Sequence, residues 1–272
     1  MRSFTAARLL RRLASGVLCA ALAPGFASAP AGADDALAAI KARGKIVVGV
    51  KTDYPPFGFL DGEKNVGLEI DLLHRIAKDL LGKADALEFV PVVSANRFQY
   101  LNTNKVDFLF STVTVTDQRK QVVDFSAPYM KSGWQILVKR SNATISDAAG
   151  LAGKTVVVVP GSTGEAGVTR LVPNANLLKL PQTSEALQAL QSGRADAFVQ
   201  DSALLYGLSQ QYPQYKVVGK SYDDMPIAAA CRKGDSAPCD YISKEIAKFA
   251  KDGTLKAEYR KWLYGAAERF MP

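Results

Sequence analysis

Short apolar runs alternate with amphipathic helical segments along most of this chain. The apolar runs have the length of buried strands, and they lie at 46–50, 87–93, 106–110, 155–159 and 197–199. Between the first two runs, apolar residues recur at helical spacing from 67 to 81, and Gly82 is placed to end that helix. Strands that alternate with helices are typical of an α/β fold.

Weaker patterns predict the remaining elements. We expect further strands at 135–138, 217–218 and 227–231. Additional helices are expected to end near 101, to follow the turn at 160–164, and to cover 202–210, 241–250 and 255–262.

One pattern occurs twice. The segment 101–108, LNTNKVDF, returns 89 positions later as LQSGRADA at 190–197. Both copies have the form of a helix end, a polar turn, a basic residue and then a strand that carries an aspartate. The likeness suggests two lobes built on one βα plan.

The N-terminal segment is predicted to be a secretory signal peptide. Four arginines precede an Ala- and Leu-rich run at 13–26, and Ala31-Gly32-Ala33 forms a cleavage site before Asp34. The run is shorter than the roughly 20 residues that span a bilayer. Leu18 is too large for lipid attachment at Cys19. We therefore expect export to the periplasm without an anchor.

Charge and length narrow the function classes. Removing residues 1–33 removes four arginines and no acids, so the formal charge falls from +8 to +4 over 239 residues. The Lys and Arg residues are scattered, which does not indicate nucleic-acid binding. A chain of this length exceeds one typical domain, so two lobes are expected.

Histidine and cysteine chemistry offers little for catalysis. The single histidine, His74, falls on the polar face of the helix at 67–81 and is expected to be solvated. Such a position argues against His-dependent triads and most zinc sites. Cys231 and Cys239 are either a short disulfide loop, favoured in an oxidising compartment, or two free thiols. Neither a metal nor a cofactor is expected.

The most informative stretch is 106–129, VDFLFSTVTVTDQRKQVVDFSAPY. An apolar strand ends in hydroxyls, those of Ser111, Thr112 and Thr114, and then reaches Arg119. A guanidinium offers parallel donors to a carboxylate, and hydroxyls and free backbone N–H groups can satisfy its other lone pairs. Thr116 is a plausible helix N-cap, which puts Arg119 at the third helical position. The stretch predicts an anion-binding site.

Other predicted strands end in similar chemistry. The first is followed by Asp53-Tyr54-Pro55-Pro56-Phe57, where two prolines force an extended turn that presents the aromatics. The strand at 155–159 is followed by Pro160-Gly161-Ser162-Thr163-Gly164, a glycine-containing turn that lacks the Gly-Lys-Ser/Thr ending of a P-loop. The repeat's second strand ends at Asp201. Ligands of open α/β sheets bind outside such strand ends.

In this order the motifs resemble the periplasmic amino-acid-binding proteins of ABC importers, solute-binding protein family 3. The resemblance covers nearly all of residues 34–272 and rests on short matching segments: DYPPF at 53–57, GLEIDL at 67–72, KVD at 105–107, TVTDQR at 114–119, DFSAPY at 124–129, GST at 161–163, GRADA at 193–197 and Asp201.

The resemblance implies a fold and a working arrangement. It implies two α/β lobes of the type II periplasmic binding protein, joined by two crossovers near 130–133 and 221–225. Lobe 1 would be discontinuous, from 34–130 and 225–272, and lobe 2 would be 134–221. The protein would be a monomer that delivers its ligand to a membrane ABC permease.

The resemblance also implies roles for individual residues. Arg119 would clamp the ligand α-carboxylate with Thr114 and Thr163, and Asp201 would receive the α-ammonium. Tyr54 would form a wall against the ligand side chain. The positions that match other ligand-contacting segments of the family are Asp53, Ser111, Thr112 and Ser162.

The segment Ser94-Ala95-Asn96-Arg97 resembles the one that aims an arginine at the distal carboxylate in aspartate- and glutamate-binding members. The Ile-Pro that usually follows is replaced here by Phe98-Gln99, so Arg97 is either a ligand residue or a structural one. A polar amino acid, with the acidic glutamate and aspartate included, is the expected ligand.

An exported lyase resembling cyclohexadienyl dehydratase is the alternative on the same fold. Such an enzyme needs a general acid in the cleft. An ammonium-binding Asp201 beside an intact Thr-x-x-Arg favours binding, and the sequence indicates no further cleft acid.

Overall fold

The computed structural model describes residues 35–263 and 265–272. Most of its strands form a single mixed sheet in the order β10-β9-β11-β8-β12-β6-β1-β5, with β7 paired to β12. The strands of this sheet are β1 (Ile46–Val50), β5 (Leu87–Pro91), β6 (Phe108–Thr114), β7 (Val123–Phe125), β8 (Met130–Lys139), β9 (Thr155–Val158), β10 (Asn176–Lys179), β11 (Ala197–Asp201) and β12 (Tyr215–Arg232). A small antiparallel sheet adds β2 (Asp53–Tyr54), β3 (Gly58–Asp61) and β4 (Lys64–Val66).

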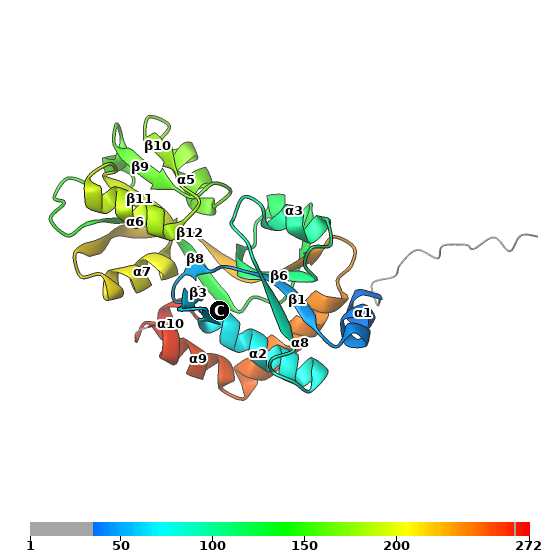
Figure 1. Ribbon diagram of the computed structural model, residues 1–272. Coiled ribbons are helices and arrows are strands. Elements are labelled where there is room, and N and C mark those ends of the chain that lie inside the picture. The colour runs from blue at the N-terminus through cyan, green and yellow to red at the C-terminus, as the bar shows by residue number, and fades with distance from the viewer. Residues whose placement is uncertain (1–34, 264) are drawn as a thin grey trace, which may run out of the picture. The chain divides into compact units, whose positions relative to one another are not determined.

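Helices cover both ends of the sheet (Figure 1). Those of the β1, β5 and β6 end are α1 (Asp35–Arg43), α2 (Leu68–Leu81), α3 (Arg97–Asn102), α4 (Asp117–Lys120), α8 (Ala237–Lys251), α9 (Thr254–Trp262) and α10 (Ala267–Phe270). Those of the β9, β10 and β11 end are α5 (Thr163–Leu171), α6 (Thr183–Ser192) and α7 (Ser202–Gln211), with a 3-10 turn at Ala149–Leu151. The long strands β8 and β12 join the two ends.

The helix α2 forms where its apolar spacing predicts it. Leu68, Leu72 and Ile76 are buried on one face. Gly82 ends the helix in a left-handed conformation and donates its N–H to the Lys78 carbonyl. Gly67 precedes it with φ 129°, and a Cβ there would lie 2.2 Å from the Phe57 carbonyl oxygen. This close approach brings the 53–57 turn onto the start of α2.

The repeated sequence pattern has a shared structural role. The Asp107 carboxylate accepts a hydrogen bond of 2.7 Å from the Val47 N–H, and the Asp196 carboxylate accepts one of 2.9 Å from the Thr155 N–H. Asp107 comes directly before β6 and binds the neighbouring parallel strand β1, and Asp196 comes directly before β11 and binds the start of the neighbouring parallel strand β9. The two ends of the sheet therefore repeat one βα plan, as the sequence predicts.

The predicted bounds of two strands need a correction. Separate strands at 217–218 and 227–231 were expected, but β12 runs without a break from 215 to 232. Strand β8 likewise begins at Met130 rather than at 135. The two segments pair with each other, and register shifts around Tyr222 allow the bend. The Tyr222 ring also stacks on Trp134 at 4.3 Å. Ladder hydrogen bonds and stacking thus extend the strands through polar sequence that has no strand pattern.

Cys231 and Cys239 form a disulfide that ties the end of β12 to α8. Both residues are buried. Of the two alternatives left by the sequence, the structure has the bonded one.

His74 lies with Asp71, Arg75 and Lys78 on the polar face of α2 and is partly exposed to solvent, as the sequence predicts. Its Nδ1 lies 2.7 Å from the Ala84 carbonyl oxygen and its ring lies edge-on against Phe89. Among residues 35–263 and 265–272, no cluster of three or more His, Cys, Asp or Glu side chains suits a metal ion.

None of the described helices combines the length and apolarity needed to cross a membrane. The predicted signal peptide, 1–33, lies outside the described residues.

We expect Asp107→Ala to reduce the free energy of unfolding by about 1–3 kcal/mol, because it leaves the Val47 N–H without its acceptor. Arg43→Ala is the control, since it removes only the exposed ion-pair partner of the same carboxylate and should cost less than about 1 kcal/mol. Urea unfolding of both variants measures this. Equal losses would mean that the ion pair, rather than the backbone contact, carries the effect.

Candidate functional site

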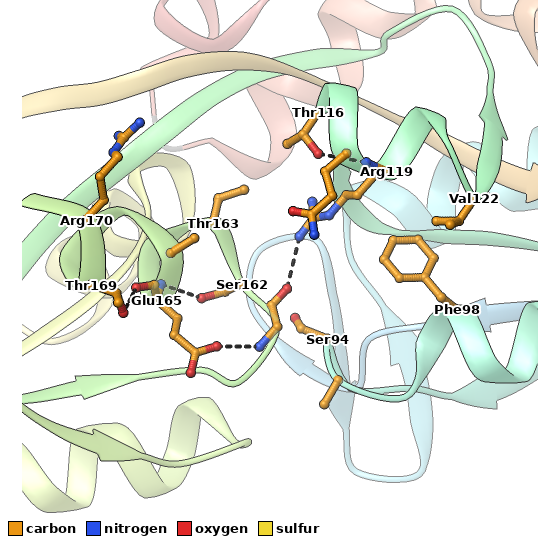
Figure 2. A pocket seen from close by; sticks show the side chains of 14 residues that line it. Ser94, Phe98, Thr116, Arg119, Val122, Ser162, Thr163, Glu165, Thr169 and Arg170 are labelled. Carbon is orange, nitrogen blue, oxygen red and sulfur yellow. Dashed lines mark hydrogen bonds between the residues drawn. The ribbon is translucent and has the colours of Figure 1, made fainter.

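A small cavity lies where the carboxyl ends of several strands meet. Its volume is about 10 Å³, room for roughly one water molecule. The residues that line it come from both ends of the sheet and are almost all polar: Lys51, Tyr54, Ser94, Arg97, Thr112, Thr114, Arg119, Ser162, Thr163, Gln200 and Asp201. A wider groove of about 770 Å³ adjoins the cavity, and Figure 2 shows Arg119 and Thr116 on one side of it with Ser162, Thr163 and Glu165 on the other.

Arg119 connects the two sides of this site. The Thr116 hydroxyl accepts from the Arg119 N–H at 3.2 Å, which confirms the predicted N-cap. The guanidinium donates to the Thr114 carbonyl at 2.8 Å and, across the groove, to the Gly161 carbonyl at 3.0 Å (Figure 2). Burial, assisted by the nearby Arg97 charge, lowers the pKa of Arg119 to about 9. The guanidinium thus remains the cationic form at neutral pH.

Asp201 supplies the opposite charge. It ends β11, is only 6% exposed, and its carboxylate accepts a hydrogen bond of 2.6 Å from the Tyr54 hydroxyl. Burial raises the pKa of Asp201, while the Tyr54 hydrogen bond and the charges of Arg97 and Arg119 oppose that rise. The hydroxyl of Tyr54, expected to wall the ligand side chain, is therefore directed at the carboxylate.

Arg97 is a buried residue of the cavity and not a surface arginine. One nitrogen, Nη1, donates to the carbonyls of Ser111 at 2.8 Å and Thr112 at 3.3 Å. Its Nε is buried and has no hydrogen-bond partner among the described residues. Phe98 lies against both guanidinium groups, 5.3 Å from that of Arg97 and 5.7 Å from that of Arg119. The phenylalanine that departs from the family pattern thus packs against the two cations.

The structure brings eight of the ten predicted residues to the cavity: Tyr54, Arg97, Thr112, Thr114, Arg119, Ser162, Thr163 and Asp201. Ser111 is not among them, because neighbours on a strand point to opposite faces and Thr112 takes the inner position. Asp53 is also outside. Its carboxylate accepts from the Thr183 N–H at 2.6 Å, at the start of α6.

Residues 46–265 match the family of bacterial extracellular solute-binding proteins, family 3. The chain belongs to this family.

Three similar proteins show the range of its relatives. The chain is 37% identical over 231 residues to the ABC transporter glutamine-binding protein GlnH of Bacillus subtilis (strain 168), with 84% of this chain and 85% of that protein covered. It is 33% identical over 263 residues to the L-cystine-binding protein TcyJ of Escherichia coli (strain K12), with 96% and 97% covered. A solute receptor for L-cysteine from Neisseria gonorrhoeae superposes with a TM-score of 0.83 at 37% identity, with 87% and 99% covered.

These relatives confirm the predicted family and the two-lobed α/β fold. The two curated relatives are named as amino-acid-binding proteins, the one from Bacillus subtilis as that of an ABC transporter. This confirms the expectation of a binding protein rather than an enzyme. The family is described as extracellular, in agreement with the predicted export.

Sequence reasoning missed three residues that line the cavity of this solute-binding protein, namely Lys51, Ser94 and Gln200. Lys51 is 3% exposed and donates to the Ser94 hydroxyl at 3.0 Å. Burial, with the Arg97 charge second, lowers the pKa of Lys51 to about 7. Lys51 could have been identified in the sequence by its position directly after a buried strand, where ligand-binding residues of α/β sheets are found.

A fourth missed residue, Glu69, supports the site from behind. It is fully buried on α2, and its Oε1 accepts from the Thr112 N–H at 2.7 Å and from the Tyr129 hydroxyl. Thr112 has a φ of 54°, a conformation that residues other than glycine rarely adopt. The Glu69 contact therefore holds Thr112 in the orientation that presents its carbonyl to Arg97.

We expect Lys51→Met to make the protein more stable at neutral pH, by an amount that shrinks as pH rises. In the unfolded chain a lysine keeps its proton up to about pH 10.4, whereas folded Lys51 loses it near pH 7. Between these values the unfolded chain binds one more proton, so wild-type stability rises with pH.

The methionine variant lacks this dependence. Its advantage should fall by up to about 1.4 kcal/mol per pH unit between about pH 7 and 9, measured by urea unfolding. An advantage that stays constant over this range would show that Lys51 keeps its proton in the folded protein.

Proposed function

We propose that this protein captures a polar α-amino acid between its two lobes and delivers it to an ABC permease. The observation that carries the proposal is the pair Arg119 and Asp201, a partly buried cation and a buried anion that face one small cavity from opposite ends of the sheet. A zwitterion needs both charges, because an unpaired buried charge costs several kcal/mol. Relatives named for binding glutamine, cystine and cysteine support the ligand class.

Arg119 takes the ligand α-carboxylate in this proposal. Its guanidinium now donates to two backbone carbonyls, and a carboxylate is the stronger acceptor for the same donors. Thr163 begins α5, whose N-cap is Ser162, so the free N–H groups of that helix also face an anion favourably. Thr114 lines the same side of the cavity.

Asp201 takes the α-ammonium. An ammonium group has three donors and fits beside a carboxylate that already accepts from the Tyr54 hydroxyl. Among the described residues that line the cavity, Asp201 provides the one carboxyl group. The positive end of the ligand therefore has a single counterpart.

The ligand side chain is proposed to meet Arg97, Thr112 and Gln200. Each has a buried polar atom without a hydrogen-bond partner, namely Arg97 Nε, Thr112 Oγ1 and Gln200 Nε2. Two of these atoms are N–H donors, and buried donors without acceptors are costly. A side chain that ends in carboxylate or amide oxygens supplies the missing acceptors, so glutamate, aspartate and glutamine are the first candidates.

Capture requires the lobes to separate and close. With the lobe boundaries that we propose, 34–130 with 225–272 and 134–221, three hydrogen bonds join the lobes at the site: Tyr54 to Asp201, Arg119 to Gly161 and Thr183 to Asp53. Opening breaks these contacts while the paired strands β8 and β12 act as the hinge. The closed form is the one that a permease would recognise.

We expect Asp201→Asn to weaken amino-acid binding by about 100-fold or more, because the amide keeps the shape and the Tyr54 contact but loses the charge that pairs with the ammonium. Calorimetric titration measures the loss. Asp61→Asn, a change at the exposed last residue of β3, is the control and should bind like wild type. Near wild-type affinity in Asp201→Asn would remove Asp201 from the proposal.

A second variant tests the side-chain subsite. Arg97→Met should reduce the thermal stabilisation given by glutamate or aspartate more than that given by alanine or serine, because only the longer acidic side chains reach the guanidinium. Comparing ligands within one variant cancels the general loss of stability from the Ser111 and Thr112 contacts. A wild-type preference for a basic amino acid would eliminate the acidic and polar candidates.

A further inference from the structure

Lys51 is a buried lysine that lines the cavity but takes no part in the proposed contacts with the zwitterion. It follows the end of β1, its Nζ donates to Ser94 Oγ at 3.0 Å, and the same nitrogen lies 5.4 Å from the centre of the Tyr54 ring. Only 3% of the residue is exposed. Lysine is almost never buried this far unless it has a partner of opposite charge.

Lys51 has no such partner in the described part of the chain. Its hydrogen bond goes to a hydroxyl, which does not neutralise an ammonium. The carboxylates nearest to it are engaged elsewhere: Asp201 with the Tyr54 hydroxyl, Asp53 with the Thr183 N–H, and Glu69 with Thr112 and Tyr129. Because Lys51 lines the cavity, its remaining hydrogen-bonding capacity is available to a ligand there.

The charges around Lys51 decide which ligand it suits. The titratable and charged groups that face it from the neighbouring elements are Asp53 and Tyr54 on β2, Glu69 on α2, Arg97 on α3 and Asp201 on β11, with Arg119 on α4 across the cavity. Three of these groups are carboxyl groups and two are guanidinium groups, and none of the three carboxyl groups forms an ion pair with Lys51 in the described part of the chain. A buried lysine without such a partner favours its neutral form.

Relative to a neutral amino acid, an acidic one adds one negative charge to this group of charges. Burying an uncompensated carboxylate is costly, and a protonated Lys51 supplies the missing positive charge within the same cavity. In this step the neutral amine of Lys51 takes one proton from the solvent and becomes an ammonium. A neutral side chain such as that of glutamine requires no such step.

We propose that Lys51 is a specificity-determining residue that takes up a proton when an acidic amino acid binds. This inference rests on the proposed amino-acid function and deepens it, because it makes the protonation of one lysine the difference between acidic and neutral ligands.

The proposal predicts how the affinity for an acidic amino acid changes with pH. Burial lowers the pKa of Lys51 to about 7, so the amine is mostly neutral one unit above that value. A ligand carboxylate next to it favours the charged form and raises the pKa again. Affinity for glutamate should therefore fall as pH rises from about 7 to 9, by up to tenfold per pH unit, while affinity for glutamine stays constant.

The test is calorimetric titration of the wild-type protein with L-glutamate and with L-glutamine at about pH 8. Each titration is run in phosphate and in Tris, buffers whose different ionisation enthalpies reveal the number of protons exchanged. The expected result is uptake of close to one proton per glutamate and close to none per glutamine. No uptake with glutamate, or equal uptake with both ligands, would overturn the inference.

Two variants assign the proton to Lys51. Lys51→Met should abolish proton uptake and weaken glutamate binding by about tenfold or more, with a smaller effect on glutamine. Lys51→Arg keeps a permanent charge, so it should bind glutamate without proton uptake and without the pH dependence. Unchanged proton uptake in Lys51→Met would overturn the assignment, and thermal unfolding checks that each variant is folded.

The same data separate this inference from the proposed function. If no common amino acid binds to the wild-type protein, the proposed function itself fails. If glutamate and glutamine bind but exchange no protons, the amino-acid function stands and the role of Lys51 falls.

Discussion

The structure depends on the burial of opposite charges at one point between two lobes. Arg97 and Arg119 bring positive charge to the cavity, and Lys51 adds a buried amine. Asp201 and Glu69 bring negative charge to the cavity or directly behind it. Each is held by hydrogen bonds to backbone or hydroxyl groups, which lowers the cost of removing it from water. The charges that remain without ionic partners define the ligand, because an α-amino acid offers a complementary charge at each end.

The fold supplies the rigid frame for these charges. Paired strand ends carry Lys51, Thr114 and Asp201, and helix starts carry Arg119 and Thr163. The equivalent aspartates, Asp107 and Asp196, fix the parallel strands behind each half of the site. Among the described strands, β8 and β12 are the ones that run through both halves. Such a connection is typical of hinge motion between lobes.

Much of this arrangement was predictable from local sequence. The helix α2, the capped turn at Thr116 and the strand that ends at Asp201 follow from apolar spacing, cap residues and the repeated segment, which all act over short distances. The continuity of β12 was not predictable, because pairing with β8 imposes strand structure on polar residues such as Ser221 and Asp224.

The site was predicted less completely for a similar reason. Lys51 and Gln200 become cavity residues only when distant segments meet, and Glu69 reaches Thr112 across 43 positions of sequence. Asp53, which stands beside Tyr54 in the chain, is drawn instead to the start of α6. Residue type and spacing identify strand ends, whereas the packing of the two halves decides which side chains share the cavity.

The clamping of both ends of a zwitterion can be tested by changing the ligand. The most direct measurement is calorimetric titration of the wild-type protein with its best-binding amino acid, with the N-acetyl derivative and with the α-amide of the same amino acid. Loss of about 100-fold or more in affinity is predicted for each derivative, because each leaves a buried charge unpaired. Binding of either derivative at close to the affinity of the parent amino acid would contradict the account.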